Sequence, residues 1–167
     1  MAAQWRCSET VQGEWMVKVE RSALMAFAPQ QLLALVEDVA RYPEFMPGCV
    51  GASVENADGG CVQAGLRFKF AGITESFLTE NVMGQSSNGD ATLQMRLLRG
   101  PFKSLTGEWR FRALGESSLA PQACKVSLVI TLDWGAWSPG RLLSPQLDRA
   151  VGNVMQAFTL RAAQIYG

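Results

Sequence analysis

Apolar and polar residues alternate from residue 16 onward, and the period of this alternation changes along the chain. The segment MVKVERSALM, residues 16–25, has the period of two that is typical of a strand. In APQQLLALVEDV, residues 28–39, the period becomes that of a helix, and Pro29 suits its first position. The apolar face of this segment consists of Leu32, Leu35, Val36 and Val39. The pattern predicts a strand followed by an amphipathic helix of about three turns.

The segment RYPEFMPGC, residues 41–49, separates this helix from the rest of the chain. Pro43 and Pro47 cannot continue the helix, because proline lacks an N–H group and restricts the residue before it. We therefore expect a short second helix or turn that fixes the entry of the chain into a sheet.

From residue 50 the period returns to two and stays there for most of the chain. The predicted strands are residues 50–54, 62–70, 73–81, 91–98, 103–114 and 124–134. In the first pair we expect Val54 to face Val62 across a turn centred on Asp58, with a glycine in a left-handed conformation. Because no segment between the strands suits a parallel crossover, the sheet is predicted to be antiparallel, with one apolar and one polar face.

Residues 144–167 restore the helical period. Ser144 suits the N-cap and Pro145 the first position of a long helix. Its apolar stripe consists of Leu147, Val151, Val154, Phe158, Ala162 and Ile165. The fold class is therefore α+β: a curved antiparallel sheet of about six or seven strands around a long C-terminal helix, with two short helices after the first strand.

Composition bounds the domain organisation and the location. A chain of 167 residues is long enough for one domain, which we place at residues 14–167. Residues 1–13 show no periodicity, so we expect a disordered leader there, or translation that starts at Met16. No run approaches the roughly 18 apolar residues of a membrane span, and the first residues lack the apolar core of a signal peptide. We expect a cytoplasmic protein.

The chain contains no histidine, which excludes Ser-His and Cys-His nucleophile pairs and histidine metal sites. Its four cysteines are Cys7, Cys49, Cys61 and Cys124. Because they form no CxxC motif, we expect reduced structural thiols, and no metal site or catalytic residue is predicted.

Four blocks in order carry a resemblance to a known family: ALVEDVARYPEFMPGC (34–49), AGI (71–73), GPFKSLTGEWRF (100–111) and VMQAFTLRAAQIYG (154–167). With them the chain resembles the START-like family often labelled polyketide cyclase/dehydrase, which includes bacterial ribosome-association toxins and mitochondrial coenzyme Q-binding proteins. The resemblance implies the helix-grip fold of START and plant-allergen-like domains, which tends to leave a cavity between sheet and helix.

The resemblance also implies a hydrophobic ligand, coenzyme Q (ubiquinone) or a related polyprenyl lipid, bound in support of respiration. No other cofactor is expected. The candidate cavity residues are Tyr42, Phe45, Met46, Phe68, Phe70, Leu93, Met95, Trp109, Phe111, Leu128, Ile130, Val151, Val154, Met155 and Phe158. Apolar residues of this kind equally suit a filled core, and residues 41–49 suit either a hydrophobic gate at the cavity rim or a plain connector.

A second group of candidates is basic and lies in or near two predicted strands. Its members are Arg96, Arg99, Lys103, Arg110 and Arg112, with Glu108 as the one acid among them. They suit a solvated sheet face, or a patch for the phosphates of ribosomal RNA or of an anionic membrane. The alternative function is therefore inhibition of ribosome association through the large subunit, and peripheral contact with the inner membrane is a further expectation. Because the fifteen acidic and fifteen basic residues cancel, we expect no DNA partner.

Two further expectations concern strand residues. A minor alternative is cyclase or dehydratase activity, for which Glu75, Glu80, Asp133 and Arg67 are the available polar groups. Gly107, within a predicted strand, suggests a bulge or a close approach of the backbone.

Overall fold

The structure is a computed structural model. It describes residues 16–167 except 60, 71, 116–122 and 136–139, and it leaves the side chains of 56–58, 70 and 140–144 undescribed. The predicted leader, residues 1–13, lies outside the described residues.

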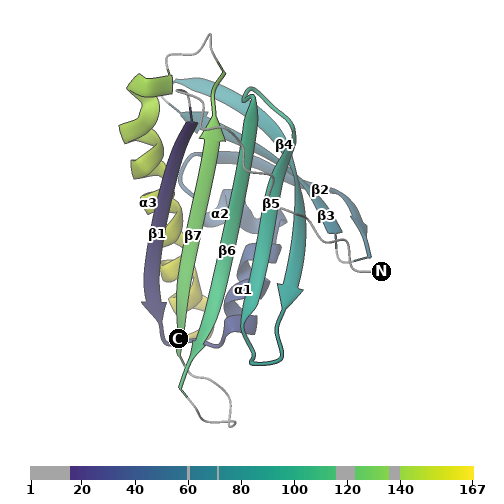
Figure 1. Ribbon diagram of the computed structural model, residues 1–167, viewed down its shortest axis with the longest axis vertical. Coiled ribbons are helices and arrows are strands. Elements are labelled where there is room, and N and C mark those ends of the chain that lie inside the picture. Colours follow the sequence, from purple (N-terminus) through teal and green to yellow (C-terminus); the bar gives the residue numbers. More distant parts are fainter. Residues whose placement is uncertain (1–15, 60, 71, 116–122, 136–139) are drawn as a thin grey trace.

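A seven-stranded antiparallel sheet forms the body of the protein (Figure 1). Its strands are β1 (Met16–Met25), β2 (Cys49–Asp58), β3 (Cys61–Phe70), β4 (Ile73–Gln85), β5 (Ala91–Arg99), β6 (Ser104–Leu114) and β7 (Ala123–Asp133). They lie in the order β1-β7-β6-β5-β4-β3-β2, so the first strand pairs with the last. The prediction of one antiparallel sheet is confirmed.

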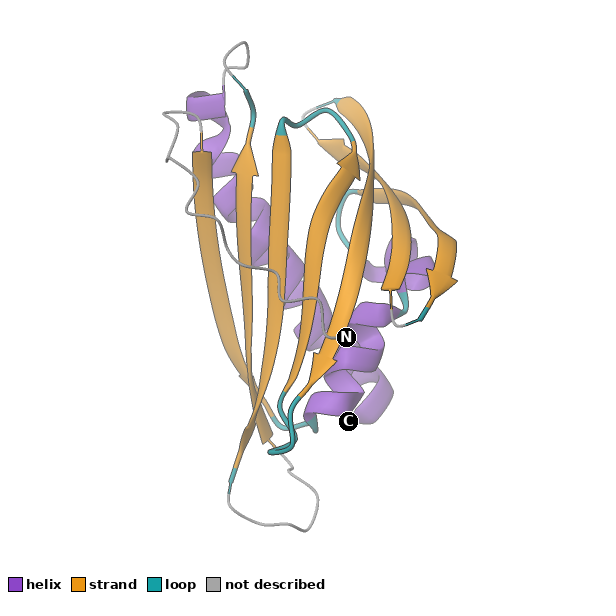
Figure 2. Cartoon of the chain, turned by 45° about the vertical axis from the view of Figure 1, so that its right-hand side comes forward, coloured by secondary structure: helices purple, strands orange, loops and turns teal. Residues whose placement is uncertain are grey.

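All the helices lie on one face of this sheet, which we call the inner face (Figures 1 and 2). They are α1 (Pro29–Glu37), the 3-10 turn η1 (Val39–Arg41), α2 (Tyr42–Phe45) and α3 (Gly140–Tyr166). Helix α3 packs mainly against β1, α1 against β5 and β6, and α2 against β2. The predicted helix-grip arrangement is confirmed. Among the described residues, no helix is long and apolar enough to cross a lipid bilayer.

Helix α1 begins as its sequence predicts. Pro29 occupies the first position, and the Ala28 N–H donates to the Gln31 side chain at 2.9 Å. The four predicted apolar positions, Leu32, Leu35, Val36 and Val39, are buried. Pro43 lies in the first turn of α2, where its missing N–H removes no helical hydrogen bond.

Helix α3 departs from the prediction at both ends. It begins at Gly140, so Pro145 lies inside the helix and Ser144 is not its N-cap. At the other end Ile165 remains 48% exposed, while its neighbour Tyr166 packs against the core. Val151, Phe158 and Ala162 of the predicted stripe are buried, and Leu147 and Val154 are half-buried.

The predicted pairing of Val54 with Val62 is wrong. Val54 pairs with Ala64 and Val62 pairs with Ala57, because the β2–β3 ladder shifts register between Val54 and Asn56 and the hairpin turn is shorter than expected. Gly59 in this turn has a φ of 55°, the left-handed conformation that the sequence led us to expect there.

Gly107 does not form a bulge, since its pairing with Met95 on β5 and Ile130 on β7 continues the ladders on both sides. A glycine is required here because two neighbouring side chains occupy the space that a Cβ atom would need. A Cβ atom at this position would collide with the end of the Met95 side chain and would lie 2.9 Å from Ile130 Cδ1. The Met95 and Ile130 side chains therefore cover bare backbone at Gly107.

Tyr42 joins α1 to α2 inside the core. Its hydroxyl donates to the carbonyl of Val36, and the ring is only 7% exposed. Burial raises the pKa of Tyr42 well above its ordinary value, with smaller contributions from Cys49 and Asp38. The hydroxyl therefore stays protonated and remains a donor.

We expect Tyr42→Phe to lower the free energy of unfolding by about 1–2 kcal/mol, because the Val36 carbonyl loses its buried donor. Urea denaturation followed by circular dichroism measures this. The control is Tyr166→Phe, whose hydroxyl donates to the Gln31 carbonyl at 3.1 Å in an exposed position and whose loss should cost less than about 0.5 kcal/mol. Equal losses for the two variants would contradict the prediction.

Candidate functional site

Most of the candidate cavity residues form a closed core where the helices meet the sheet. The buried ones are Tyr42, Met46, Leu93, Trp109, Phe111, Leu128, Val151, Met155 and Phe158. A cavity of only about 10 Å³ remains between α1, the sheet and α3, bordered by Leu35, Trp109 and Phe158 among others. This volume holds at most one water molecule, so side chains fill the interior at this place.

A second part of the inner face is only half-buried. We name its side chains the inner apolar strip: Leu66, Phe68, Met95, Leu97, Ile130 and Val154. They come from β3, β5, β7 and α3, and most of them pack against the closed core. Phe45 is also half-buried, and the side chain of Phe70 lies outside the description. The candidate residues therefore divide into a closed group and a partly exposed group.

A row of aromatic rings continues this half-buried surface. Phe68 stacks on Phe77 with ring centroids 5.9 Å apart, Phe77 meets Phe102 at 6.0 Å, and Phe102 meets Trp134 edge-on at 4.9 Å. The Trp134 indole N–H is buried, and none of the described residues accepts a hydrogen bond from it. The row links β3 and β4 to the β5–β6 turn and to the end of β7.

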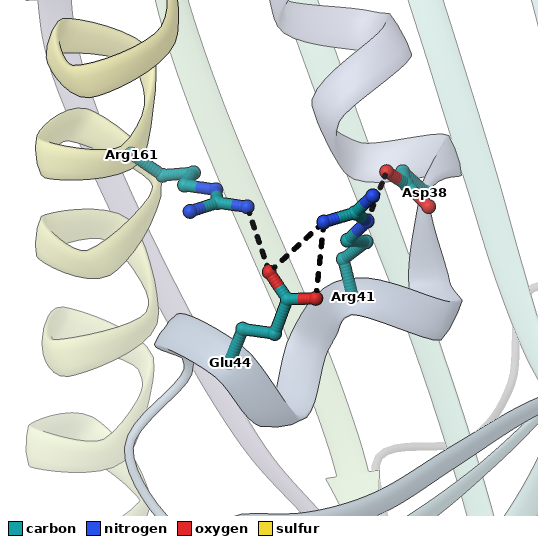
Figure 3. Close-up of polar contacts among 4 residues, drawn as sticks. All are labelled: Asp38, Arg41, Glu44 and Arg161. Atoms are coloured by element: carbon teal, nitrogen blue, oxygen red, sulfur yellow. Dashed lines mark hydrogen bonds and ion pairs between the residues drawn. The ribbon is translucent and has the colours of Figure 1, made fainter.

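Helix α2 is held against α3 by ring contacts and by ion pairs, and Figure 3 shows the ion pairs. Phe45 and Tyr42 meet Phe158 of α3 edge-on, at 5.3 and 5.4 Å between ring centroids. Arg161 lies over the Phe45 ring at 5.2 Å and donates to Glu44 at 3.0 Å. Arg41 also bonds Glu44, at 3.2 Å (Figure 3). Because these ions are partly exposed, their contribution to stability is small, and their main effect is on position.

Two polar residues interrupt the apolar inner face on β4. Thr79 is 2% exposed and Asn81 is 6% exposed. The Thr79 hydroxyl lies 3.0 Å from Asn81 Oδ1 and 3.4 Å from the Ala64 carbonyl. Within the described part of the chain, no acceptor lies opposite the Asn81 amide N–H groups.

The candidate basic residues point to the outer face or the rim of the sheet, and most of them are paired. Arg96 pairs with Glu80, Arg110 with Glu108 at 2.8 Å, Lys103 with Asp133 at 3.4 Å, and Arg99 with Glu55 at 3.8 Å. Arg112 makes no ion pair with the residues described. A hydrogen bond from Arg96 lowers the pKa of Glu80, and the same bond raises the pKa of Arg96. Four of the five candidate cations are therefore partly neutralised.

A groove of about 330 Å³ on the outer face was not expected from the sequence. It lies over β2, β3 and β4, and its floor is backbone at Gly51 and Gly65, where the Arg67 and Ser53 side chains lean over the glycines. Its walls carry Ser53, Glu55, Arg67, Ser76, Leu78 and Arg99. Because Glu55 pairs with Arg99, and Arg67 has no ion pair among the described residues, the groove carries a net positive charge.

Comparison with known proteins shows which family shares this fold. The model of the family "Polyketide cyclase / dehydrase and lipid transport" matches residues 25–159. The chain belongs to this family. "Ribosome association toxin RatA" of Vibrio cholerae is 38% identical over 152 residues, which cover 91% of this chain and 99% of the relative. The family resemblance seen in the four sequence blocks is confirmed.

Two further proteins are similar to this chain, one in sequence and one in fold. "Coenzyme Q-binding protein COQ10 homolog B, mitochondrial" of Xenopus laevis is 25% identical over 156 residues, covering 93% of this chain and 62% of that protein. A START superfamily protein from Mycobacterium smegmatis has the same fold, with a TM-score of 0.72 at 17% identity, covering 89% of this chain and 98% of that one.

The family description includes enzymes, but the polar candidates lie apart. Glu75 is exposed, Arg67 lines the outer groove, and Glu80 is paired with Arg96. Asp133 is 8% exposed and accepts from the Gly135 N–H at 2.9 Å in addition to pairing with Lys103. No three His, Cys, Asp or Glu side chains cluster as metal ligands within the residues described.

The cysteine thiols are also poorly suited to nucleophilic attack. Burial raises the pKa of Cys124 to about 11 and raises that of Cys49 as well. Cys61, which is half-buried, has its pKa raised by burial and by Glu80. Thiols with raised pKa values carry little thiolate near neutral pH, so the described cysteines suit a structural role.

Sequence reasoning missed two features that the structure brings together: the polar pair on β4 and the outer groove. The signal for the first was present, because Phe77, Thr79, Asn81 and Met83 share one parity on their strand. The groove gave no such signal, since it depends on which residues of β2, β3 and β4 are neighbours.

We expect Arg96→Gln to reduce stability at neutral pH and to weaken its loss in acid. Glu80 has a folded pKa below its unfolded value, so its contribution is present above the unfolded pKa and disappears as the pH falls through the folded one. Urea denaturation at several pH values between 3 and 7 measures the difference from wild type. Arg112→Gln is the control; a wild-type acid profile for Arg96→Gln would contradict the prediction.

Proposed function

We propose that the protein binds a hydrophobic ligand, a polyprenyl lipid such as ubiquinone, along the inner apolar strip beside α3. The observation that carries the proposal is the division of the inner face into a filled core and a half-buried apolar strip. The family's description includes lipid transport, and the name of the Xenopus relative includes coenzyme Q binding; both support the proposal. On this proposal the chain has a binding role rather than an enzymatic one.

The strip suits an isoprenoid tail, because binding such a tail requires only dryness and shape. Each methylene that leaves water contributes roughly 0.8 kcal/mol. Since the closed cavity is only about 10 Å³, the tail must occupy the strip or displace side chains from it. Met95, which covers Gly107, is the side chain best able to move, because methionine has three rotatable bonds.

The setting that follows from this proposal is respiratory. A protein that shields a quinone tail from water supports respiration by carrying the quinone or holding it ready. It would act in the cytoplasm, with peripheral contact at the inner membrane where the quinone resides.

We expect the natively purified protein to contain about one molecule of quinone or another polyprenyl lipid, recovered by solvent extraction and identified by mass spectrometry. Ile130→Gln should reduce this occupancy about tenfold, since a half-buried apolar side chain contributes about 1.5 kcal/mol. Val129→Gln, on the opposite face of β7 and also half-buried, should retain wild-type occupancy. Both variants should be shown to fold by circular dichroism.

Absence of any co-purified lipid, together with failure of the apoprotein to take up added ubiquinone, would contradict the proposal. So would equal occupancy in Ile130→Gln and wild type.

A second candidate function is association with the large ribosomal subunit, which would block subunit joining. The name of the Vibrio relative favours it, and so does the net positive groove on the outer face. Within this groove Arg67 is free of ion pairs with the described residues, and the Ser53 and Ser76 hydroxyls lie beside it. Phosphate groups of RNA are the ligands that such a combination suits.

We expect Arg67→Glu to lower co-sedimentation with large ribosomal subunits several-fold at low salt, because it replaces a phosphate contact by repulsion. The matched control is Arg112→Glu, which makes the same charge change at an exposed position on β6, three strands away in the sheet. Arg96→Glu is a poor probe, since it would place a new carboxylate directly beside that of Glu80.

Loss of binding in Arg112→Glu with full binding in Arg67→Glu would assign the contact to the basic strand residues expected from the sequence. No co-sedimentation of the wild-type protein would contradict ribosome association itself.

A further inference from the structure

The polar pair on β4 stands next to the inner apolar strip and not deep in the closed core. Asn81 pairs across the sheet with Val62 on β3 and with Met95 on β5, and both of these side chains are half-buried. Its own side chain is nevertheless 94% buried, since its exposed fraction is 6%. An amide is thus held among apolar neighbours at the border between the filled and the partly exposed parts of the inner face.

Thr79 fixes which end of this amide is free. Its hydroxyl has one proton, and the acceptor at 3.0 Å, Asn81 Oδ1, is closer than the Ala64 carbonyl at 3.4 Å. With Oδ1 occupied by Thr79, the Asn81 Nδ2 group supplies the two unused N–H donors. Within the described residues neither N–H group has an acceptor, and Asn81 Nδ2 is not one of the fully enclosed polar atoms there that lack a partner, so an oxygen from outside the chain can reach this amide nitrogen.

The surroundings of the amide restrict what that partner is. An apolar strip beside one double donor, with no cation among its members, matches a molecule with a long hydrocarbon part and an uncharged oxygen acceptor. A carbonyl or ether oxygen has this character, whereas a carboxylate or phosphate would require a positive charge for its burial. Met95 lies beside Asn81 and over Gly107, so its movement would open the strip next to the amide.

We infer that the Asn81 amide donates a hydrogen bond to a carbonyl or ether oxygen in the head group of the lipid bound on the inner apolar strip. Thr79 is the positioning residue that orients this amide. The inference rests on the lipid-binding function proposed above, and it adds the polar contact that gives selectivity. Without such a contact the strip would bind any hydrocarbon of similar shape.

Two probes of similar isoprenoid character separate the polar contact from simple apolar binding. Ubiquinone with a short isoprenoid tail has carbonyl and methoxy oxygens, and squalene has none. Their affinities are measured by quenching of the intrinsic tryptophan fluorescence, directly for the quinone and by competition for squalene. Wild type should prefer the quinone; Asn81→Leu should lose about tenfold in quinone affinity and keep its squalene affinity.

The matched control is Gln94→Leu, which removes an exposed amide on the outer face of β5 and should leave both affinities unchanged. Thr79→Val keeps the shape of the positioning residue and removes its hydroxyl. It should weaken quinone binding about threefold and leave squalene binding intact. This second variant also keeps the test decisive if Asn81→Leu fails to fold.

Each outcome decides between defined possibilities. An equal loss for both probes in Asn81→Leu would mean that the amide has only a structural role, and unchanged quinone affinity would likewise overturn the inference. If wild type binds both probes equally well, lipid binding stands and the head-group contact is refuted. If wild type binds neither probe, the proposed function itself fails.

Discussion

A seven-stranded sheet has more apolar inner surface than the helices of this protein can cover, and the rest of the structure follows from that constraint. Helix α3 packs mainly along β1, and α1 covers part of β5 and β6. Where these helices meet, their side chains close around Trp109 and Phe158, leaving a cavity of about 10 Å³. On β3, β5 and β7 some inward side chains, among them Leu66, Met95 and Ile130, remain half-buried. A site for an apolar ligand is thus a consequence of incomplete cover and not of a hollow core.

The short segment between α1 and β2 determines where the closed part ends. Tyr42 is anchored to α1 through the Val36 carbonyl, and Phe45 lies against Phe158 of α3. Arg161 contacts the same turn through Glu44 (Figure 3) and through the face of the Phe45 ring. Because these contacts join three helical elements at one point, the role of residues 41–49 that the contacts support is structural. Any movement there during ligand binding would have to break ring contacts that also stabilise the core.

The sequence was sufficient for the elements and the fold class, because alternation reports which residues share a face. It was insufficient for the register, since the shift between Val54 and Asn56 moves every later pair of the β2–β3 ladder by one residue, and alternation along a strand does not show where such an extra residue lies. The sequence also did not show how deeply each residue is buried. Trp109 and Met95 both point inward, but Trp109 is buried and Met95 is only half-buried. The start of α3 was missed because a proline was assumed to mark the first turn.

The sequence was also insufficient to show which charged residues of the candidate site are paired. Along the sequence Arg96 has no acidic neighbour, although Glu80 on the adjacent strand pairs with it, whereas Arg110 pairs with Glu108 of its own strand. Arg67 does not stand out in the sequence of its strand. In the structure it lines a groove whose floor is bare backbone at Gly51 and Gly65, and it has no ion pair among the described residues. Charge patterns along a strand therefore predict a patch only when the cross-strand neighbours are known.

The two proposed functions use opposite faces of the same strands. On β3, Arg67 lines the outer groove while Phe68 belongs to the inner strip, and on β4 the outward Ser76 lines the groove while Thr79 points inward; Leu66 and Phe77 also border the groove. Since successive side chains of a strand point to opposite sides, a substitution on one face leaves the other face chemically unchanged. Ligand binding inside and ribosome binding outside are thus separable by mutation even though they share a backbone. The converse also holds: any ligand that changed the curvature of β3 and β4 would alter both faces at once.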